Sequence, residues 1–331
     1  MDDEPEPTAP APRSPRLRIV LRSHGGENLK SRPPYYSKLL ALTSVVRAAH
    51  EAGGSPQLIF WNDGPVPADR LDVMRAWGDV ARVDAGSNRE SYRAAVRMVT
   101  TSGWPSDDVV WFAEDDYLYR PAAFRMLRAA AAAIPQADYL SMIGGRALDQ
   151  ASPLTATRGY PRRGAVDVPD AIVVDGVSWF RGVSTTSTFG ARLGVLREDA
   201  RLLRQLPYSG GAWDHTTCLT VQGRQPFTWQ EIGRDLRPAA GSGTAALAAA
   251  TARGAVRASV RVGTNLRSRR RADHRRTLYL CDPVGTRHLE LPGAADGLDW
   301  ERLVEETRAW GRERGIAVPV RLTGGSAPST G

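Results

Sequence analysis

The sequence predicts an α/β protein with a mostly parallel central sheet and helices on both faces. Short apolar runs alternate with helical patterns along the first half of the chain, and 42% of its 331 residues are hydrophobic. Alternation of strand and helix is typical of parallel sheets, because each crossover helix returns the chain to the same edge. A chain of this length and composition can bury a sizeable core.

The strands expected in the first half are short apolar runs that end at turn signals. The first run, LRIVL, is apolar enough to be buried on both faces. The second run, QLIFW, is closed by the strong turn sequence NDGP at residues 62–65. We expect strands over residues 17–21, 57–61, 80–83, 109–113 and 139–143.

The helices expected between these strands carry apolar residues at helical spacing. The first contains two prolines at its start, where a helix tolerates them, and ends at a Gly-Gly pair. The Asn88 side chain is suited to cap the third of these helices, expected over residues 89–100. The expected helices cover residues 33–52, 69–77, 89–100 and 121–134.

The pattern is weaker after about residue 150. We expect strands at 172–174, 177–180 and 277–280, and helices at 192–206, 212–221, 245–262 and 300–314.

The Pro-rich acidic residues 1–15 and the small polar residues 322–331 are predicted to be disordered tails. Between them we expect one domain over 16–321, with halves 16–150 and 151–321 and an Arg-rich insert at about 235–276.

The positive charge is confined to one segment. The net charge is +8 and 42 of the 44 basic residues are Arg, but residues 253–276 hold nine Arg and one Asp. The rest of the chain is therefore neutral, which disfavours a uniformly basic nucleic-acid binder. Two interpretations of the segment stay open: contact with a phosphate-bearing ligand or an anionic headgroup, and a solvated mobile loop.

Other classes of protein are disfavoured by composition. The two cysteines, Cys218 and Cys281, are far apart, so a disulfide framework and a cysteine zinc site are not expected. No apolar run approaches the length of a membrane span, and residues 1–15 do not resemble a signal peptide. We expect a cytoplasmic protein, with peripheral contact to a membrane surface left open.

The most informative residues are the three acids Glu114, Asp115 and Asp116, which directly follow the apolar run VVWFA. Ligands of parallel α/β sheets bind at the carboxyl ends of strands. Three neighbouring carboxylates repel one another unless a cation lies among them, and Mg²⁺ or Mn²⁺ prefers such oxygen ligands. The alternative is a solvated acidic turn that caps the next helix.

The segment VVWFAEDDYLYRPAAF resembles the metal-binding strand end of GT-A glycosyltransferases of the family-2 type, where a DxD-like triplet follows an apolar strand. Further segments resemble that family in the expected order, between residues 17 and 290: LIFWNDGP, AGSNRESYRAAVRMV, ADYLSMIGG, STTSTFGARLGVLREDARLL, GGAWDHTTCLTV and DPVGTRHLE. Two features depart from the pattern: the triplet is Glu-Asp-Asp, and residues 229–276 match no usual element.

The resemblance implies a GT-A, Rossmann-like fold with a nucleotide-sugar-binding half at 16–150 and an acceptor half at 151–321. It implies a divalent metal, Mn²⁺ or Mg²⁺, held by Asp116 and His288, and a catalytic base at Asp214. The residues implied in donor binding are Asp63, Asn88, Glu114 and Asp115.

Each of these residues also has a purely structural interpretation. Asp214 is suited to complement a helix dipole, Asp63 to begin a tight turn, and Asn88 to cap a helix. A lone histidine such as His288 is more often structural. These alternatives stay open at the level of the sequence.

The predicted function is a metal-dependent, hexosyltransferase-like glycosyltransferase, expected to invert. It would transfer a sugar from a nucleotide-sugar to a saccharide, lipid-linked or small-molecule acceptor; no nucleic-acid partner is expected. One alternative is a sugar-phosphate nucleotidyltransferase, for which the loop sequence SHGGEN is short and acidic. Another is a non-catalytic module that binds RNA or a membrane through the Arg-rich segment.

Overall fold

The structure is a computed structural model that describes residues 15–27, 31–143, 171–237, 244–271, 274–291 and 297–320. Apart from Pro15, both predicted tails lie outside the described residues. Residues 238–243 and 272–273 of the predicted Arg-rich insert also lie outside them.

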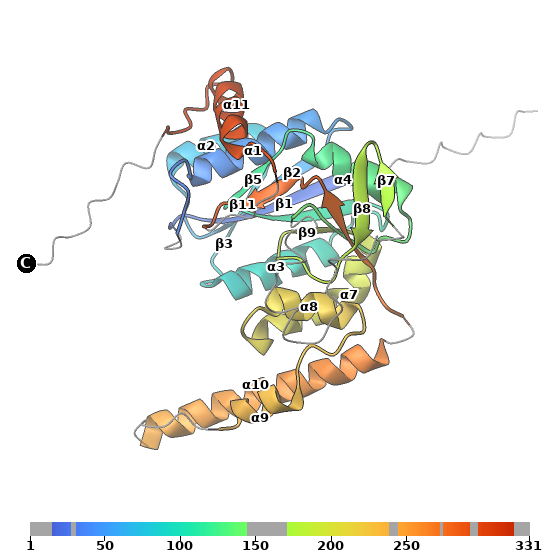
Figure 1. Cartoon of the computed structure of the whole chain (residues 1–331). Helices are drawn as coiled ribbons and strands as arrows, with labels where there is room; N and C mark the ends of the chain where they lie inside the picture. Colours follow the sequence, from blue (N-terminus) through green and yellow to red (C-terminus); the bar gives the residue numbers. More distant parts are fainter. Residues whose placement is uncertain are drawn as a thin grey trace, which may run out of the picture.

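Within the described residues, nine strands form one sheet in the order β3-β2-β1-β4-β9-β6-β10-β8-β7 (Figure 1). Strands β8 and β9 run against the other seven, so the sheet is mostly parallel, as predicted. Strand β9 lies between β4 and β6, so the two predicted halves contribute neighbouring strands. The strands are β1 (Leu17–His24), β2 (Gln57–Asp63), β3 (Asp79–Val83), β4 (Val109–Glu114), β6 (Tyr139–Ser141), β7 (Ile172–Val174), β8 (Val177–Arg181), β9 (Phe189–Arg192) and β10 (Leu278–Asp282).

Helices cover both faces of this sheet (Figure 1). On one face lie α1 (Lys38–Glu51), α2 (Ala68–Trp77), α4 (Ala123–Ala133) and α11 (Trp300–Arg312). On the other lie α3 (Asn88–Thr100), α7 (Leu193–Gln205), the short 3₁₀ helix η1 (Leu206–Ser209) and α8 (Trp213–Val221). The mixed α/β fold class is therefore confirmed.

Two cores lie on the two faces because side chains alternate along each strand. On β4, Trp111 and Ala113 join the core beneath α1 and α4. Val110 and Phe112, one residue out of phase, join the core beneath α3 and α7. Strands buried on both faces are apolar throughout, which explains the continuous runs in the sequence.

A pair of short strands connects the late part of the chain to the end of β4. Strand β5 (Tyr117–Tyr119) pairs antiparallel with β11 (Thr286–His288), and His288 lies opposite Tyr117. Neither strand was predicted, because three residues are too few to show a pattern.

Two helix starts differ from the prediction. Helix α1 begins at Lys38 rather than residue 33, because the Ser37 hydroxyl caps it by accepting from the Leu40 amide at 3.0 Å. The cap of α3 is Ser87, whose hydroxyl accepts from the Glu90 amide at 3.3 Å. The prediction of a cap at Asn88 was wrong: it is the first residue of the helix.

The Arg-rich segment forms a helical arm on the far side of α8 (Figure 1). Helix α10 (Thr244–Arg270) runs eight residues beyond the helix predicted at 245–262. The added residues include poor helix formers, but Thr264, Asn265 and Ser268 among them are buried, so packing extends the helix. The unpredicted helix α9 (Trp229–Asp235) packs antiparallel along it, with Ile232 buried against Ala258 and Val262. We call residues 228–237 and 244–271 the α9–α10 arm.

Candidate functional site

An open cleft of about 540 Å³ lies at the carboxyl ends of the parallel strands β1, β2 and β4. This is where ligands of α/β sheets bind. The cleft brings together all five of the residues predicted to bind the donor or the metal from the first half of the chain. They are Asp63, Asn88, Glu114, Asp115 and Asp116.

The three acids after β4 are each paired with a different basic side chain. The Glu114 carboxylate accepts from Arg22 at 2.7 Å, and Asp115 lies 2.9 Å from the Lys38 ammonium. Asp116 accepts from the Arg32 guanidinium at 2.9 Å. The mutual repulsion that pointed to a metal ion is thus largely offset by the protein's own cations.

Asp116 also contacts His288, 172 residues further along the chain, with 3.0 Å between Oδ2 and the histidine Nε2. Burial opposes the ionisation of Asp116, but hydrogen bonds and charge from His288 and Arg32 outweigh it and lower its pKa to about 2. Asp116 is therefore an anion throughout the physiological range. The β5–β11 pairing positions the histidine, and its ring stacks on Tyr117 at 4.7 Å.

The pair of Asp116 and His288 fits two ligands of one divalent ion. Their separation of 3.0 Å is that of a hydrogen bond, and it also equals the distance between neighbouring ligands of an octahedral ion at about 2.1 Å, so it is compatible with either arrangement. The other ring nitrogen of His288 lies 3.2 Å from Glu290, as is usual for metal-bound histidines. No group of three His, Cys, Asp or Glu side chains suited to a metal occurs among the described residues.

Glu114 occupies the inner wall of the cleft. Burial raises its pKa more than the charge of Arg22 lowers it, and nearby Asp116 raises it further. The same Arg22 side chain donates to the Asn88 side-chain oxygen at 2.9 Å and stacks over Tyr92. Arg22 therefore holds two predicted donor-binding residues, Glu114 and Asn88, in fixed positions.

Asp63 ends β2 and shapes the opposite wall. Its Oδ1 accepts from the amides of Ala85 and Gly86 at 2.8 and 3.3 Å, which fixes the loop after β3. One carboxylate oxygen of Asp63 therefore has a structural role, but toward the loop after β3 rather than in the tight turn expected from the sequence, and the residue also lines the cleft.

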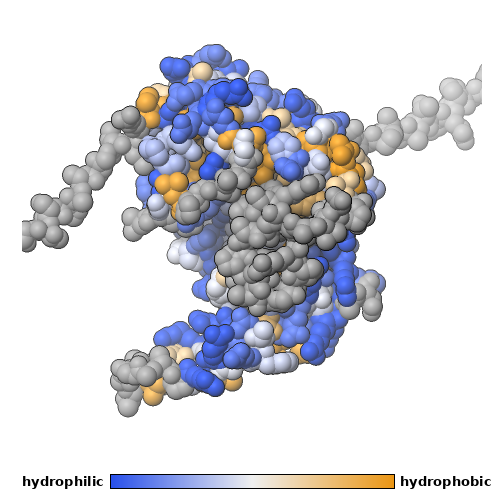
Figure 2. Space-filling model, viewed as in Figure 1, coloured by the Kyte–Doolittle hydropathy of each residue, from blue (hydrophilic) through white to orange (hydrophobic). Residues whose placement is uncertain are grey.

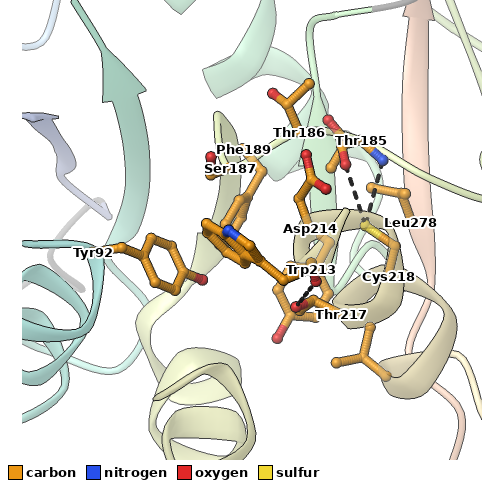
Figure 3. A pocket seen from close by; sticks show the side chains of 12 residues that line it. Tyr92, Thr185, Thr186, Ser187, Phe189, Trp213, Asp214, Thr217, Cys218 and Leu278 are labelled. Carbon is orange, nitrogen blue, oxygen red and sulfur yellow. Dashed lines mark hydrogen bonds between the residues drawn. The ribbon is translucent and has the colours of Figure 1, made fainter. Parts of the chain in front are cut away.

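Asp214 lies in the first turn of α8 and lines a second, small and mainly apolar pocket (Figure 3). Trp213 forms one wall, packed 4.6 Å from the ring of Tyr92, whose hydroxyl is buried without a hydrogen-bond partner in the described structure. Ser187 lines this pocket and hydrogen-bonds to Glu114, which lines the cleft. The two pockets therefore adjoin at these two side chains.

The sequence interpretation missed the three basic partners Arg22, Arg32 and Lys38. Each is buried or nearly so, and each pairs with an acid about 75 to 95 positions away. Lys38 carried a signal, since it is one of two lysines in a chain with 42 arginines.

No protein-family model and no curated protein matches this sequence. Among solved structures it is similar to glucosyl-3-phosphoglycerate synthase from Mycobacterium tuberculosis, in complex with Mn²⁺, uridine diphosphate and phosphoglyceric acid. The identity is 16% and the TM-score 0.35, over 54% of this chain and 56% of that chain, so the match spans little more than half of the synthase.

Two further solved structures resemble this chain at comparable identities and TM-scores. S. aureus TarS (residues 1–349) aligns at 13% identity and a TM-score of 0.37, over 62% of this chain and 54% of that chain. CMP:2-keto-3-deoxy-manno-octonic acid synthetase in complex with CTP aligns at 17% identity and a TM-score of 0.35, over 56% and 78%. At TM-scores below 0.5 these similarities carry no argument about this chain, so the function has to rest on the site residues.

Proposed function

We propose that this protein is a glycosyltransferase that moves a sugar from a nucleotide-sugar to an acceptor hydroxyl. One observation carries the proposal: the acids at the ends of β2 and β4 share one cleft, and His288 reaches Asp116 from the other half of the chain. The cleft volume of about 540 Å³ lies within the usual range for small-molecule sites.

The donor would lie along the cleft, with its nucleotide near β2 and β3. Asp63 is rigidly held through Oδ1, which supports a role for its other oxygen as acceptor for a base N–H. Asp115 and Glu114 offer oxygen acceptors to the ribose and the sugar. Asn88 adds an amide beside them, fixed by Arg22.

A divalent ion, Mn²⁺ or Mg²⁺, would be held by Asp116 and His288. Such an ion supplies Lewis-acid stabilisation of the negative charge that builds up on the leaving diphosphate. Arg32 already donates to Asp116, which keeps that carboxylate ionised and oriented.

Asp214 is the proposed general base, which accepts the proton of the attacking hydroxyl. Its Oδ1 accepts from the backbone amide of His215 at 2.8 Å, which fixes the carboxylate. Its pocket adjoins the donor cleft at Ser187, and Trp213 offers an apolar wall against which a sugar face can pack. Attack from this side, opposite the leaving group, would invert the anomeric centre.

The test is a thermal-shift and donor-hydrolysis screen with a panel of nucleotides, nucleotide-sugars, Mn²⁺ and Mg²⁺. We expect metal and nucleotide together to raise Tm more than either alone. The cooperative shift should be lost in Asp116→Asn and retained in the matched control Asp72→Asn, whose carboxylate is exposed on α2. Equal shifts in both variants would refute the proposed metal site.

The products distinguish the alternatives. A glycosyltransferase releases a nucleoside diphosphate or monophosphate from a nucleotide-sugar, whereas a nucleotidyltransferase releases pyrophosphate from a nucleoside triphosphate and a sugar phosphate. Pyrophosphate release would replace the present proposal by the second activity. A protein that shows neither product and no nucleotide-dependent shift would be a binding module. A cytoplasmic location remains a prediction.

A further inference from the structure

The α9–α10 arm carries almost all of the excess charge of the protein. Residues 228–271 hold nine arginines against Glu231 and Asp235, which leaves +7 of the total of +8. The arm lies on the opposite side of the molecule from α2 and α11 (Figure 1).

Five of the six arginines of α10 fall into two groups. Arg261 is 2.9 Å from Asp235 and stacks on Phe227, so it attaches α10 to α9, and Arg257 lies 3.8 Å from the same acid but is half exposed. Arg253 and Arg270 are exposed. Together with Arg267, they have no acidic partner among the described residues.

The second group shares one face of the helix. Arg253, Val256, Val260, Gly263, Arg267 and Arg270 follow at spacings of three and four residues, which places them on a single stripe. Burial, together with the positive charges of Arg201 on α7 and of Arg270, lowers the pKa of Arg267. Positive charge is therefore crowded on this face without compensation, which favours an anionic partner.

Exposed apolar side chains lie on the same arm. Of the nine large hydrophobic residues that are exposed in the described structure, four belong to it. Val256 lies on the basic face itself, and Leu266 borders it. The four are Trp229 (57% exposed), Leu236 (54%), Val256 (64%) and Leu266 (47%). Figure 2 shows the arm as a mainly hydrophilic surface with apolar residues among the polar ones.

We propose that the α9–α10 arm docks on the surface of an anionic lipid bilayer. Arginine side chains contact lipid phosphates while neighbouring Val256 and Leu266 enter the boundary of the acyl chains, as in amphipathic helices that lie in the interface. None of the helices in the described ranges is long and apolar enough to cross the bilayer, so the contact would be peripheral. A free phosphate or RNA would satisfy the arginines but leaves the exposed apolar side chains unexplained.

The experiment is vesicle co-sedimentation of the full chain with phosphatidylcholine alone and with phosphatidylcholine mixed with phosphatidylglycerol, at low and high salt. We expect binding only to the anionic vesicles, weakened by salt. The variant R253Q/R267Q/R270Q should bind about 100-fold more weakly, since each arginine near an anionic surface contributes roughly fivefold. V256S/L266S should bind about tenfold more weakly.

The matched control is R75Q/R302Q/R312Q, which removes the same charge from exposed positions on α2 and α11. It should bind vesicles like the natural protein. Circular dichroism and Tm confirm that each variant is folded. Equal loss in both triple variants, equal binding to neutral vesicles, or binding to homopolymer RNA without vesicle binding would each overturn the proposal. The assay needs no nucleotide-sugar, so its outcome is independent of the proposed enzymatic function.

Discussion

The cleft and the α9–α10 arm handle charge in opposite ways. In the cleft, Glu114, Asp115 and Asp116 are partly or fully buried, and each has a basic partner within 2.9 Å. On the arm, Arg253 and Arg270 are exposed and have no acidic partner in the described structure. A buried charge is costly unless it is paired, whereas water solvates an exposed one at little cost.

This difference changes what each cluster signifies. An acidic cluster with its own cations does not by itself require a metal, so the proposal of a metal rests on the geometry of Asp116 and His288. A basic cluster without counter-charges is available for an external anion. The comparison predicts that variants in the cleft alter chemistry or stability, while variants on the basic face of the arm alter docking.

The largest expected effect concerns the proposed base. Asp214→Asn keeps the shape of the side chain and its hydrogen bond from the His215 amide but cannot accept a proton. We expect kcat to fall by about 10²- to 10⁴-fold with the donor Kd unchanged. Steady-state kinetics and nucleotide titration measure the two quantities.

The arm variant R253Q/R267Q/R270Q is the control for that prediction. It should turn over a soluble acceptor at the natural rate, because none of the three residues lines either pocket. Normal turnover in Asp214→Asn would refute the base assignment and reopen a retaining mechanism.

The next largest effect concerns Asp199, whose negative charge pairs with two arginines at the end of the Arg-rich segment. Asp199 on α7 is fully buried and accepts from Arg276 at 3.1 Å, from Arg271 and from the Tyr139 hydroxyl at 2.8 Å. Asp199→Asn would leave Arg271 without its acidic partner and Arg276 with only Glu198 and Asp138, so we expect a loss of about 3 kcal/mol in the free energy of unfolding.

Chemical denaturation measures this loss, and Glu198→Gln is its matched control. Glu198 also pairs with Arg276 but is 69% exposed, so its removal should cost less than about 1 kcal/mol. Similar losses in the two variants would show that the burial of Asp199 does not account for its contribution to the free energy of unfolding.

A third effect follows from the lowered pKa of Asp116. Its folded pKa of about 2 lies below the ordinary value of 3.8, so the unfolded chain takes up the proton first as the pH falls. The stability from this carboxylate is present above about pH 5 and is lost as the pH approaches 2, an effect of about 2 kcal/mol.

The measurement is denaturant unfolding of metal-free protein and of Asp116→Asn from pH 5 to pH 2. The stability gap between them should shrink by about 2 kcal/mol over that range. The gap between the natural protein and R253Q/R267Q/R270Q should stay constant, because arginine does not titrate there. A constant gap for Asp116→Asn would mean that its ion pairs with Arg32 and His288 contribute nothing.

The sheet and its helices could largely be predicted from the sequence, because local patterns encode them. Strands buried on both faces are continuous apolar runs, and four such runs became β1, β2, β4 and β6. The fifth predicted strand became β3, an edge strand whose residues are exposed or half-buried. Strand β9 was not predicted: its sequence, FGAR, contains a glycine and is too short to show a pattern. It exists because its neighbours β4 and β6 supply hydrogen bonds on both sides.

The site was predictable only in its acidic half. Asp63, Asn88 and the three acids after β4 follow strand ends or turns, and strand ends of a parallel sheet converge. Their basic partners Arg22, Arg32 and Lys38 come from distant parts of the chain, so no local pattern indicates the pairing. The same holds for His288, which only the family resemblance suggested.

The smallest expected effect concerns two arginines of the arm that both lie near Asp235. One of them is largely buried and the other is half exposed. Arg261 combines an ion pair at 2.9 Å to Asp235, a hydrogen bond at 3.2 Å to the Ser209 carbonyl and stacking on Phe227, and its side chain is 16% exposed. We expect Arg261→Gln to destabilise the protein by about 1–2 kcal/mol. Arg257 lies 3.8 Å from the same acid and is 50% exposed, so Arg257→Gln should change the free energy of unfolding by less than about 0.5 kcal/mol.

Both substitutions remove one positive charge from one helix, so they should weaken vesicle binding by similar small factors while differing in stability. Limited proteolysis and chemical denaturation would measure the stability difference. Equal stability losses would mean that Asp235 holds α10 through its charge alone rather than through the contacts that Arg261 makes. In that case ion pairing with Asp235 would no longer distinguish the arginines that attach α10 from those that face the lipid. Only the exposed fraction of each side chain would distinguish them.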